Sequence, residues 1–165
     1  MQKLHKSAGS LIIKIMNKIS DQDEQTTAVR TNSLGWWVNA AAVQVNRLMK
    51  QALENLGLTQ GQFAILMTLL ENDDIPQTAI AKRVDMPDYA ITRNLDVLEA
   101  KGLLARHNDL QSRRSFRIRL TEAGRALQPS FFAIVEQVNS AFMQPLTPAE
   151  GDQLKGLLMK LLKNT

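Results

Sequence analysis

Residues 101–119 read KGLLARHNDLQSRRSFRIR, and this stretch concentrates the net positive charge of the chain. Six of its residues are Lys or Arg and one, Asp109, is acidic, so its formal charge is +5, whereas the whole 165-residue chain carries +4. The stretch is divided by a polar turn at 108–112, which predicts two paired strands. A basic hairpin of this kind is typical of a surface that contacts phosphate groups of nucleic acid.

Two short helices are predicted before this stretch. Pro76 opens a helix around QTAIAKRV, and a second helix is expected over 87–100, with Pro87 in its first turn, where a missing N–H costs nothing. Two helices of this size joined by a tight turn indicate a helix-turn-helix. The outer face of the second helix carries groups that suit base edges and phosphates in a major groove: Asp88, Tyr89, Thr92, Arg93 and Asp96. Taken alone, these residues fit an ordinary solvated face better, since two of them are acids.

The predicted hairpin changes that balance. Its first strand is expected over 103–106 and its second over 115–120, where Phe116, Ile118 and Leu120 alternate with arginines and are expected to point inward. A two-stranded basic hairpin after a helix-turn-helix is a wing, with a solvated edge hairpin as the alternative. The pattern therefore predicts a mainly α fold with a small β-wing, a winged helix-turn-helix.

Apolar helices are expected on both sides of this domain. Residues 34–56 are apolar over much of the helix circumference, which predicts burial on several sides, and Gly57 is a natural end. A capping box from Thr59 to Gln62 begins the next helix. After the hairpin, Thr121 caps a helix in which Pro129 is expected to introduce a kink.

A leucine-rich helix follows a second capping box, from Thr147 to Glu150. Because one small domain offers too few partners for all these apolar faces, a homodimer is expected. The expected parts are an N-terminal extension and linker (1–33), a dimerisation helix (34–57), the winged helix-turn-helix DNA-binding domain (58–120) and the C-terminal dimerisation helices (121–165). Within the extension, a helical apolar stripe at 12–19 leaves open protein docking, disorder or weak membrane-surface affinity.

Composition excludes several classes of site. The chain has no cysteine and two histidines, so disulfides, thiol switches and zinc centres are not expected. No apolar run is long enough to span a bilayer, and a cytoplasmic location is expected. No carboxylate pair, glycine-rich phosphate loop or nucleophile–base spacing indicates an enzyme. We therefore expect no catalytic residue, no cofactor and no metal.

These segments resemble the MarR (multiple antibiotic resistance regulator) family of bacterial winged-helix transcription factors, over about residues 34–163. The resemblance is carried by LTQGQFAILMTLLE, AIAKRVDMPDYAITRNLDVLEAKGLLAR, DLQSRR and RLTEAG. It implies a dimer built from the first helix and the last two, with the helix 87–100 in the major groove and the wing in the adjacent minor groove. The family wing usually shows Asp-x-Arg-x-Arg-Arg, which Asp109, Arg113 and Arg114 match. Gln111 departs from that pattern, so one contact is expected to be weaker.

The expected function is repression, by a homodimer, of a pseudo-palindromic operator in double-stranded DNA. Specificity is assigned to Asp88, Tyr89, Thr92 and Arg93 of the recognition helix. Phosphate contacts are assigned to Gln77, Thr78 and Lys82 before it and to Arg113, Arg114 and Arg117 of the wing. Arg106 and Asp109 are expected to brace the wing turn, with Asp109 pairing to Arg106 or Arg113. The alternative is a winged-helix protein-interaction module without DNA binding, supported by Asp88, Asp96 and Gln111.

Regulation by a small aromatic or phenolic ligand is a further implication of the resemblance. Trp36, Trp37, Phe63 and Met67 could line a pocket for it, although plain core packing is the favoured interpretation of these four residues. The sequence leaves open the operator and target genes, the effector, the choice between repressor and activator, and the role of residues 1–30.

Overall fold

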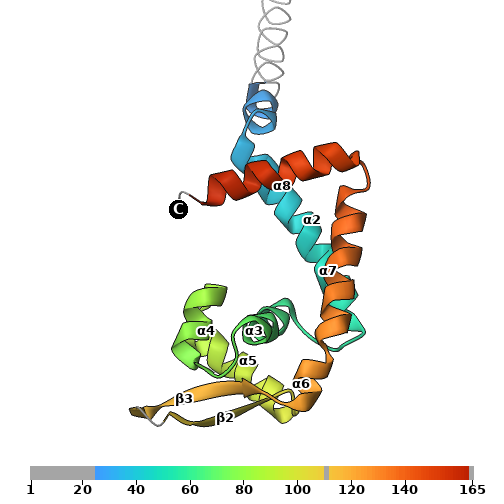
Figure 1. Cartoon of the computed structure of the whole chain (residues 1–165). Helices are drawn as coiled ribbons and strands as arrows, with labels where there is room; N and C mark the ends of the chain where they lie inside the picture. Colours follow the sequence, from blue (N-terminus) through green and yellow to red (C-terminus); the bar gives the residue numbers. More distant parts are fainter. Residues whose placement is uncertain (1–24, 110–111, 164–165) are drawn as a thin grey trace, which may run out of the picture. The chain divides into compact units, whose positions relative to one another are not determined.

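A computed structural model describes residues 25–109 and 112–163, with residues 109 and 112–115 described by their backbone alone (Figure 1). The elements, in order, are α2 (Leu34–Glu54), α3 (Gln60–Glu71), β1 (Ile75–Pro76), α4 (Gln77–Val84), α5 (Asp88–Ala100), β2 (Leu104–Asp109), β3 (Ser112–Leu120), α6 (Glu122–Ala126), α7 (Gln128–Met143) and α8 (Pro148–Leu162). This mainly helical chain with one small sheet confirms the predicted fold class. The chain divides into two units, residues 1–44 and 45–165, which are described separately.

In the first unit, residues 25–31 are helical, whereas the sequence predicted a linker there. The rings of Trp36 and Trp37 meet edge to face, with their centroids 4.7 Å apart. The Arg30 guanidinium lies 5.5 Å from the centre of the Trp36 ring, and the indole N–H of Trp37 donates to the carbonyl of Thr31 at 2.7 Å. These contacts pack residues 25–31 against the start of α2. They could not be predicted from the sequence, because they follow no periodic pattern.

The second unit has one hydrophobic core under the winged helix-turn-helix. Apolar side chains three and four positions apart on α3 and α5 point into it. The fully buried members on these two helices are Ile65, Leu66, Leu69, Ile91, Leu95 and Leu98. Both predicted capping boxes are present, at Thr59–Gln62 and Thr147–Glu150.

Two helix boundaries differ from the sequence expectation. Pro87 lies just outside α5 as its N-cap, with an extended backbone (φ −64°, ψ 150°), so the helix begins at Asp88. The helix expected after Thr121 is two helices, α6 and α7, and Pro129 stands at the start of α7. Proline is tolerated in a first turn because the N–H groups there have no partner within the helix. The predicted kink at Pro129 is therefore wrong: one helix ends and the next begins just before this residue.

The sheet has three antiparallel strands in the order β1-β3-β2, whereas a two-stranded hairpin was predicted. The added strand, β1, pairs Ile75 with Ile118, and it is too short to show an alternating pattern. Ile118 and Leu120 are buried as predicted, but Phe116 is 49% exposed. Phe116 pairs with Asn108 and lies nearer the tip of the hairpin than Ile118 and Leu120.

The base of the hairpin meets α6 at Gly124. A side-chain carbon at this position would collide with the backbone carbonyl oxygen of Leu103. That carbonyl accepts a hydrogen bond from the Thr121 amide at 3.2 Å, and the Thr121 hydroxyl donates to the Gly102 carbonyl at 2.7 Å. The glycine in RLTEAG therefore lets α6 pack directly on the chain that enters β2.

The leucines of α8 are not buried like those of α3 and α5. Within the described residues the exposed members are Leu157, Leu158, Leu161 and Leu162, at 53%, 39%, 59% and 72%. No helix in the described part of the chain combines the length and apolar character needed to cross a bilayer.

Candidate nucleic-acid interface

The helix-turn-helix is formed by α4, a tight turn and α5. Asp85 ends α4 with a left-handed backbone (φ +49°), and Pro87 then directs the chain into α5. Thr78 and Lys82, predicted to contact phosphate, line one groove of the surface together with Asp85 and Asp88. The turn therefore brings the exposed side of α4 beside the first turn of α5.

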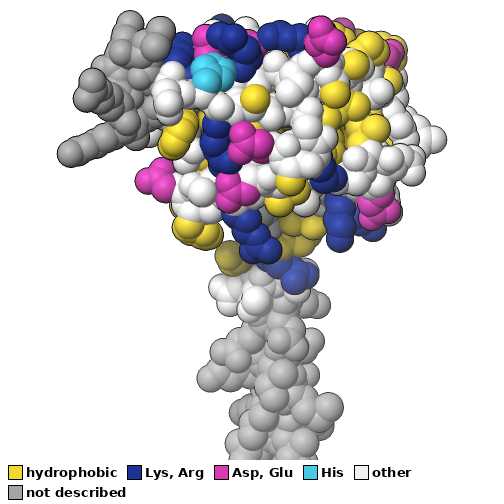
Figure 2. Space-filling model, turned by 90° about the horizontal axis from the view of Figure 1, so that it is seen from below, with side chains coloured by type: hydrophobic (Ala, Val, Ile, Leu, Met, Phe, Trp, Pro, Cys, Tyr) yellow, Lys and Arg dark blue, Asp and Glu magenta, His cyan; other side chains and the backbone are white. Residues whose placement is uncertain are grey.

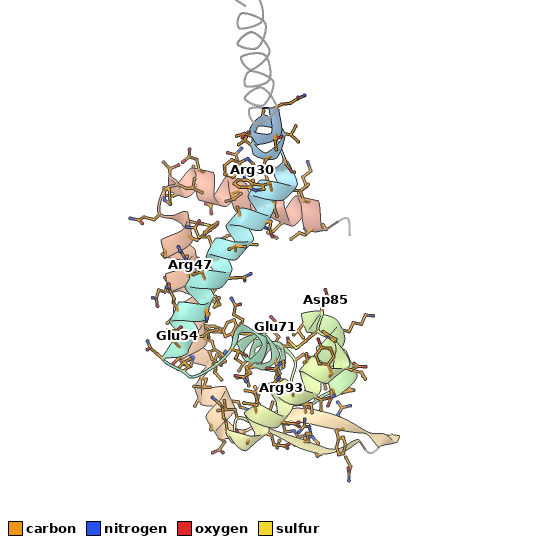
Figure 3. The ribbon with its side chains drawn as sticks, turned by 180° about the vertical axis from the view of Figure 1, so that it is seen from behind. Arg30, Arg47, Glu54, Glu71, Asp85 and Arg93 are labelled. Atoms are coloured by element: carbon orange, nitrogen blue, oxygen red, sulfur yellow. The ribbon has the colours of Figure 1, made fainter. Side chains whose placement is uncertain are left out.

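The outer face of α5 is open to solvent. Tyr89 is 78% exposed, and Asp88, Thr92 and Arg93 are exposed as well. Figure 3 labels Arg93 on this helix. Among the described residues, no carboxylate forms an ion pair with Arg93. Asp88 lies in the first helical turn, where the helix dipole favours a negative charge.

The second acid of this face, Asp96, is engaged by Arg106 of β2. The Arg106 guanidinium contacts a carboxylate oxygen of Asp96 at 2.6 Å and one of Glu99 at 2.6 Å. The Arg106 amide also donates to Glu99, at 3.0 Å. Arg106 thus braces the wing against α5. The side chain of Asp109 lies outside the described residues. Sequence reasoning missed Glu99 because its partner is set by the packing of β2 on α5.

The wing root, which we define as Asp73, Asp74, His107, Arg117 and Arg119, joins the hairpin to the turn after α3. The Asp74 carboxylate contacts His107 Nε2 at 2.9 Å, Arg117 Nε at 3.3 Å and an Arg119 nitrogen at 2.8 Å. Arg117 also donates to the backbone carbonyl of Asp74. Hydrogen bonds from His107, then Arg119 and Arg117, hold the pKa of Asp74 well below its ordinary range. The same pairing raises the pKa of Arg119.

Asp73 completes this junction. Its carboxylate accepts a hydrogen bond from the Leu120 amide at 2.9 Å and forms an ion pair with Arg125 of α6. The sequence showed Asp73 and Asp74 only as part of a turn. The available signal for their role was that two adjacent acids precede a segment rich in arginine. Their ion-pair partners could not be assigned from the sequence, because these partners lie 33 to 52 positions further along the chain.

The predicted wing contacts divide into two groups. Arg117 is one-third exposed and contacts Asp74, so its guanidinium helps to hold the wing in place. Arg113 and Arg114 lie in β3, but their side chains are outside the described residues. Figure 2 shows the lower face of the molecule, where Lys and Arg side chains are interspersed with Asp and Glu. Basic residues on this face are therefore partly neutralised by acidic neighbours.

The four residues proposed to line a ligand pocket are shared between the two units, and each pair is described within its own unit. Trp36 and Trp37 belong to the first unit and contact each other. Phe63 and Met67 belong to the second unit and pack against its core, with the Phe63 ring 5.1 Å from that of Phe131. Phe63 and Met67 thus fit the core interpretation. In the described residues no group of three or more His, Asp or Glu is arranged to hold a metal ion.

Comparison with known proteins agrees with this geometry. The model of the MarR family matches residues 58–116. The crystal structure of a probable transcriptional regulator from Pseudomonas aeruginosa is 28% identical, covers 79% of this chain and 98% of that chain, and has a TM-score of 0.71. A cysteine-to-serine mutant of MarR from E. coli, complexed with operator DNA, is 27% identical over 78% of this chain and 93% of that chain, with a TM-score of 0.71.

A third structure concerns the regulation of DNA binding of Bordetella bronchiseptica BpsR by 6-hydroxynicotinic acid. It is 26% identical, covers 78% of this chain and 97% of that chain, and has a TM-score of 0.71. These matches confirm the resemblance read from the sequence. Residues 58–116 thus match the MarR family in sequence and have its winged helix-turn-helix fold, and the similar solved structures are those of transcriptional regulators, not of enzymes.

Proposed function

We propose that the protein represses transcription in the cytoplasm by binding a pseudo-palindromic operator in double-stranded DNA as a homodimer. The observation that carries the proposal is the open outer face of α5, with Tyr89 and Arg93 exposed beside a braced wing. Arginine suits the edge of guanine, and short polar side chains suit several bases. Thr78, Lys82, Arg113 and Arg114 supply phosphate contacts in this arrangement. The operator complex of the related MarR from E. coli supports it.

The homodimer is proposed from the apolar face of α8. Exposed leucines at 157, 158, 161 and 162 form an apolar surface that a monomer would leave in water. A second copy of the chain would cover it by two-fold symmetry. Such a dimer also supplies two recognition helices, which must lie about 34 Å apart to enter successive major grooves on one side of the duplex.

The alternative, a winged-helix module that binds proteins and has lost DNA binding, has less support than the sequence alone suggested. It rested on Asp88, Asp96 and Gln111. Arg106 contacts Asp96 and so offsets part of its charge, and Asp88 lies in the first turn of α5, where the helix dipole favours an acid. Neither acid therefore argues strongly against an approaching phosphate.

Release by a small aromatic or phenolic ligand is the least supported part of the proposal. BpsR provides the precedent of a ligand that regulates DNA binding. In this chain the exposed rings available to such a ligand are Trp36 and Trp37, since Phe63 and Met67 pack against the core. Tryptophan fluorescence titrated with salicylate, alongside operator binding, tests this part. If salicylate changes neither the tryptophan fluorescence nor the operator binding, the proposal of release by a phenolic ligand is wrong.

Selection of bound sequences from a random pool of duplex DNA at physiological salt tests the main proposal. We expect enrichment of two inverted half-sites with centres about 10 base pairs apart. The matched control is the double variant Tyr89→Ala/Arg93→Ala, which keeps the fold and should lose enrichment. A wild-type protein that enriches no sequence would refute the DNA-binding proposal and favour the interaction module. Reporter expression with and without the protein then distinguishes repression from activation.

A further inference from the structure

The hydroxyl of Thr92, on the outer face of α5, has an unusual hydrogen-bonding arrangement for a helical threonine. The side-chain amide of Gln77, at the start of α4, donates to Thr92 Oγ1 at 3.0 Å. Helical threonines commonly donate their hydroxyl proton to the carbonyl four residues earlier. Thr68 in α3 does so, with its hydroxyl 2.9 Å from the Ala64 carbonyl.

Thr92 differs from Thr68 in this respect. Among the described residues, Thr92 Oγ1 receives the Gln77 amide and has no acceptor for its own proton. A hydroxyl has one donor and two acceptor positions, so an amide that occupies an acceptor position directs the proton away from itself. Thr92 is exposed, whereas Gln77 is half-buried where α4 approaches α5. The donor of Thr92 is therefore available to a group outside the protein, and the Gln77 hydrogen bond, which polarises the hydroxyl, strengthens it as a donor relative to its one remaining acceptor position.

We propose that Gln77 is a positioning residue that makes Thr92 a hydrogen-bond donor toward a base edge in the operator. The proposal rests on the proposed function, since it requires α5 to enter a major groove. Guanine and thymine present acceptors there, whereas cytosine presents an amino donor. Thr92 should consequently favour guanine or thymine over cytosine at the position it faces, and adenine, which presents both kinds of group, is uninformative. Gln77 then determines specificity through Thr92 and is not simply a phosphate contact.

Variants of both residues, analysed by selection from random duplex DNA, test the proposal. Thr92→Val keeps the shape of the side chain and identifies the position that Thr92 reads, because the preference is lost there alone. Gln77→Met removes the amide donor at similar length, so the preference for guanine or thymine over cytosine should fall about two- to tenfold, the range of one hydrogen bond. Gln77→Glu replaces the donor by an acceptor. The Thr92 proton then turns toward Glu, and the preference should shift toward cytosine.

The control variant is Lys82→Ala, on the same helix, which should weaken binding to all sequences without changing any base preference. Thermal unfolding of each variant checks that the fold is retained. We expect Gln77→Glu to fold normally, because an acid at the start of α4 interacts favourably with the helix dipole. A wild-type preference for cytosine at the Thr92 position would overturn the proposal, because the amide would then present its oxygen to Thr92. Unchanged preferences in both Gln77 variants would overturn it as well. In either case an enriched operator would leave the proposed function standing, whereas no enrichment by the wild type would refute that function itself.

Discussion

The arginines of the wing root and the arginine of the recognition helix carry the same charge but have different surroundings. Arg117 and Arg119 contact Asp74, and neighbouring Arg106 contacts Asp96 and Glu99. Arg93 has no ion pair among the described residues. The difference shows that a dense basic segment need not be a dense set of DNA contacts. Part of its charge holds the wing against the rest of the domain, and the cations without internal partners are the better candidates for DNA.

Arg106→Ala should have the largest effect, because it disturbs both structure and surface charge. The Arg106 side chain is 17% exposed and holds two carboxylates of α5. We expect the free energy of unfolding to fall by about 1.5–3 kcal/mol, the range for hydrogen bonds to charged groups. DNA affinity should fall too, since Asp96 and Glu99 would be released toward the phosphates. Urea denaturation and a fluorescence-anisotropy titration measure the two effects. Arg119→Ala, which removes a more exposed pair, should be milder, and equal losses would contradict this ranking.

Arg93→Ala should affect DNA binding and leave stability almost unchanged. If Arg93 reads a guanine, the binding free energy for the selected operator should weaken by about 1–3 kcal/mol. The free energy of unfolding should change by less than about 0.5 kcal/mol, because an exposed side chain without partners is removed. The same two measurements apply. A large loss of stability with normal DNA affinity would assign Arg93 to the structural group.

Arg114→Ala should weaken binding to every sequence alike. A lost phosphate contact reduces the dependence of log affinity on log salt concentration by about one unit, without changing base preference. Affinity measured from low to physiological salt, for the operator and for an unrelated duplex, tests this. If both affinity and salt slope stay unchanged, Arg114 is not a phosphate contact of the wing.

Acid should destabilise the wing root as Asp74 becomes protonated. This is the smallest of the expected effects, because Asp74 stays ionised near neutral pH. The pKa of Asp74 in the folded protein is lowered from its ordinary value of 3.8. A lowered carboxyl pKa stabilises the fold above about pH 4, and this contribution is lost as the pH falls further. Hydrogen exchange of the β2 and β3 amides, corrected for intrinsic rates, should therefore rise below about pH 4. Asp74→Asn should show faster exchange already at neutral pH and lack the acid-induced rise, and a wild-type-like profile in that variant would contradict this role.

The features that followed from the sequence are those set by neighbours along the chain. The buried face of α5 repeats every three or four residues, and each capping box joins residues three positions apart. The features that were missed depend on contacts between distant segments. The two-residue strand β1 exists only because Ile75 meets Ile118, and Asp74 gains its role only when His107 and Arg119 lie beside it.

The sequence by itself determined that two helices and a basic hairpin form a winged helix-turn-helix, because helical periodicity, caps and strand alternation are local properties. It also located the excess of positive charge at 101–119. Only the tertiary structure decided which of those charges are neutralised within the protein, and which polar group on α4 directs Thr92. Ion pairs and hydrogen bonds depend on distances of about 3 Å between atoms, and segments far apart in the chain reach such distances only when the fold brings them together.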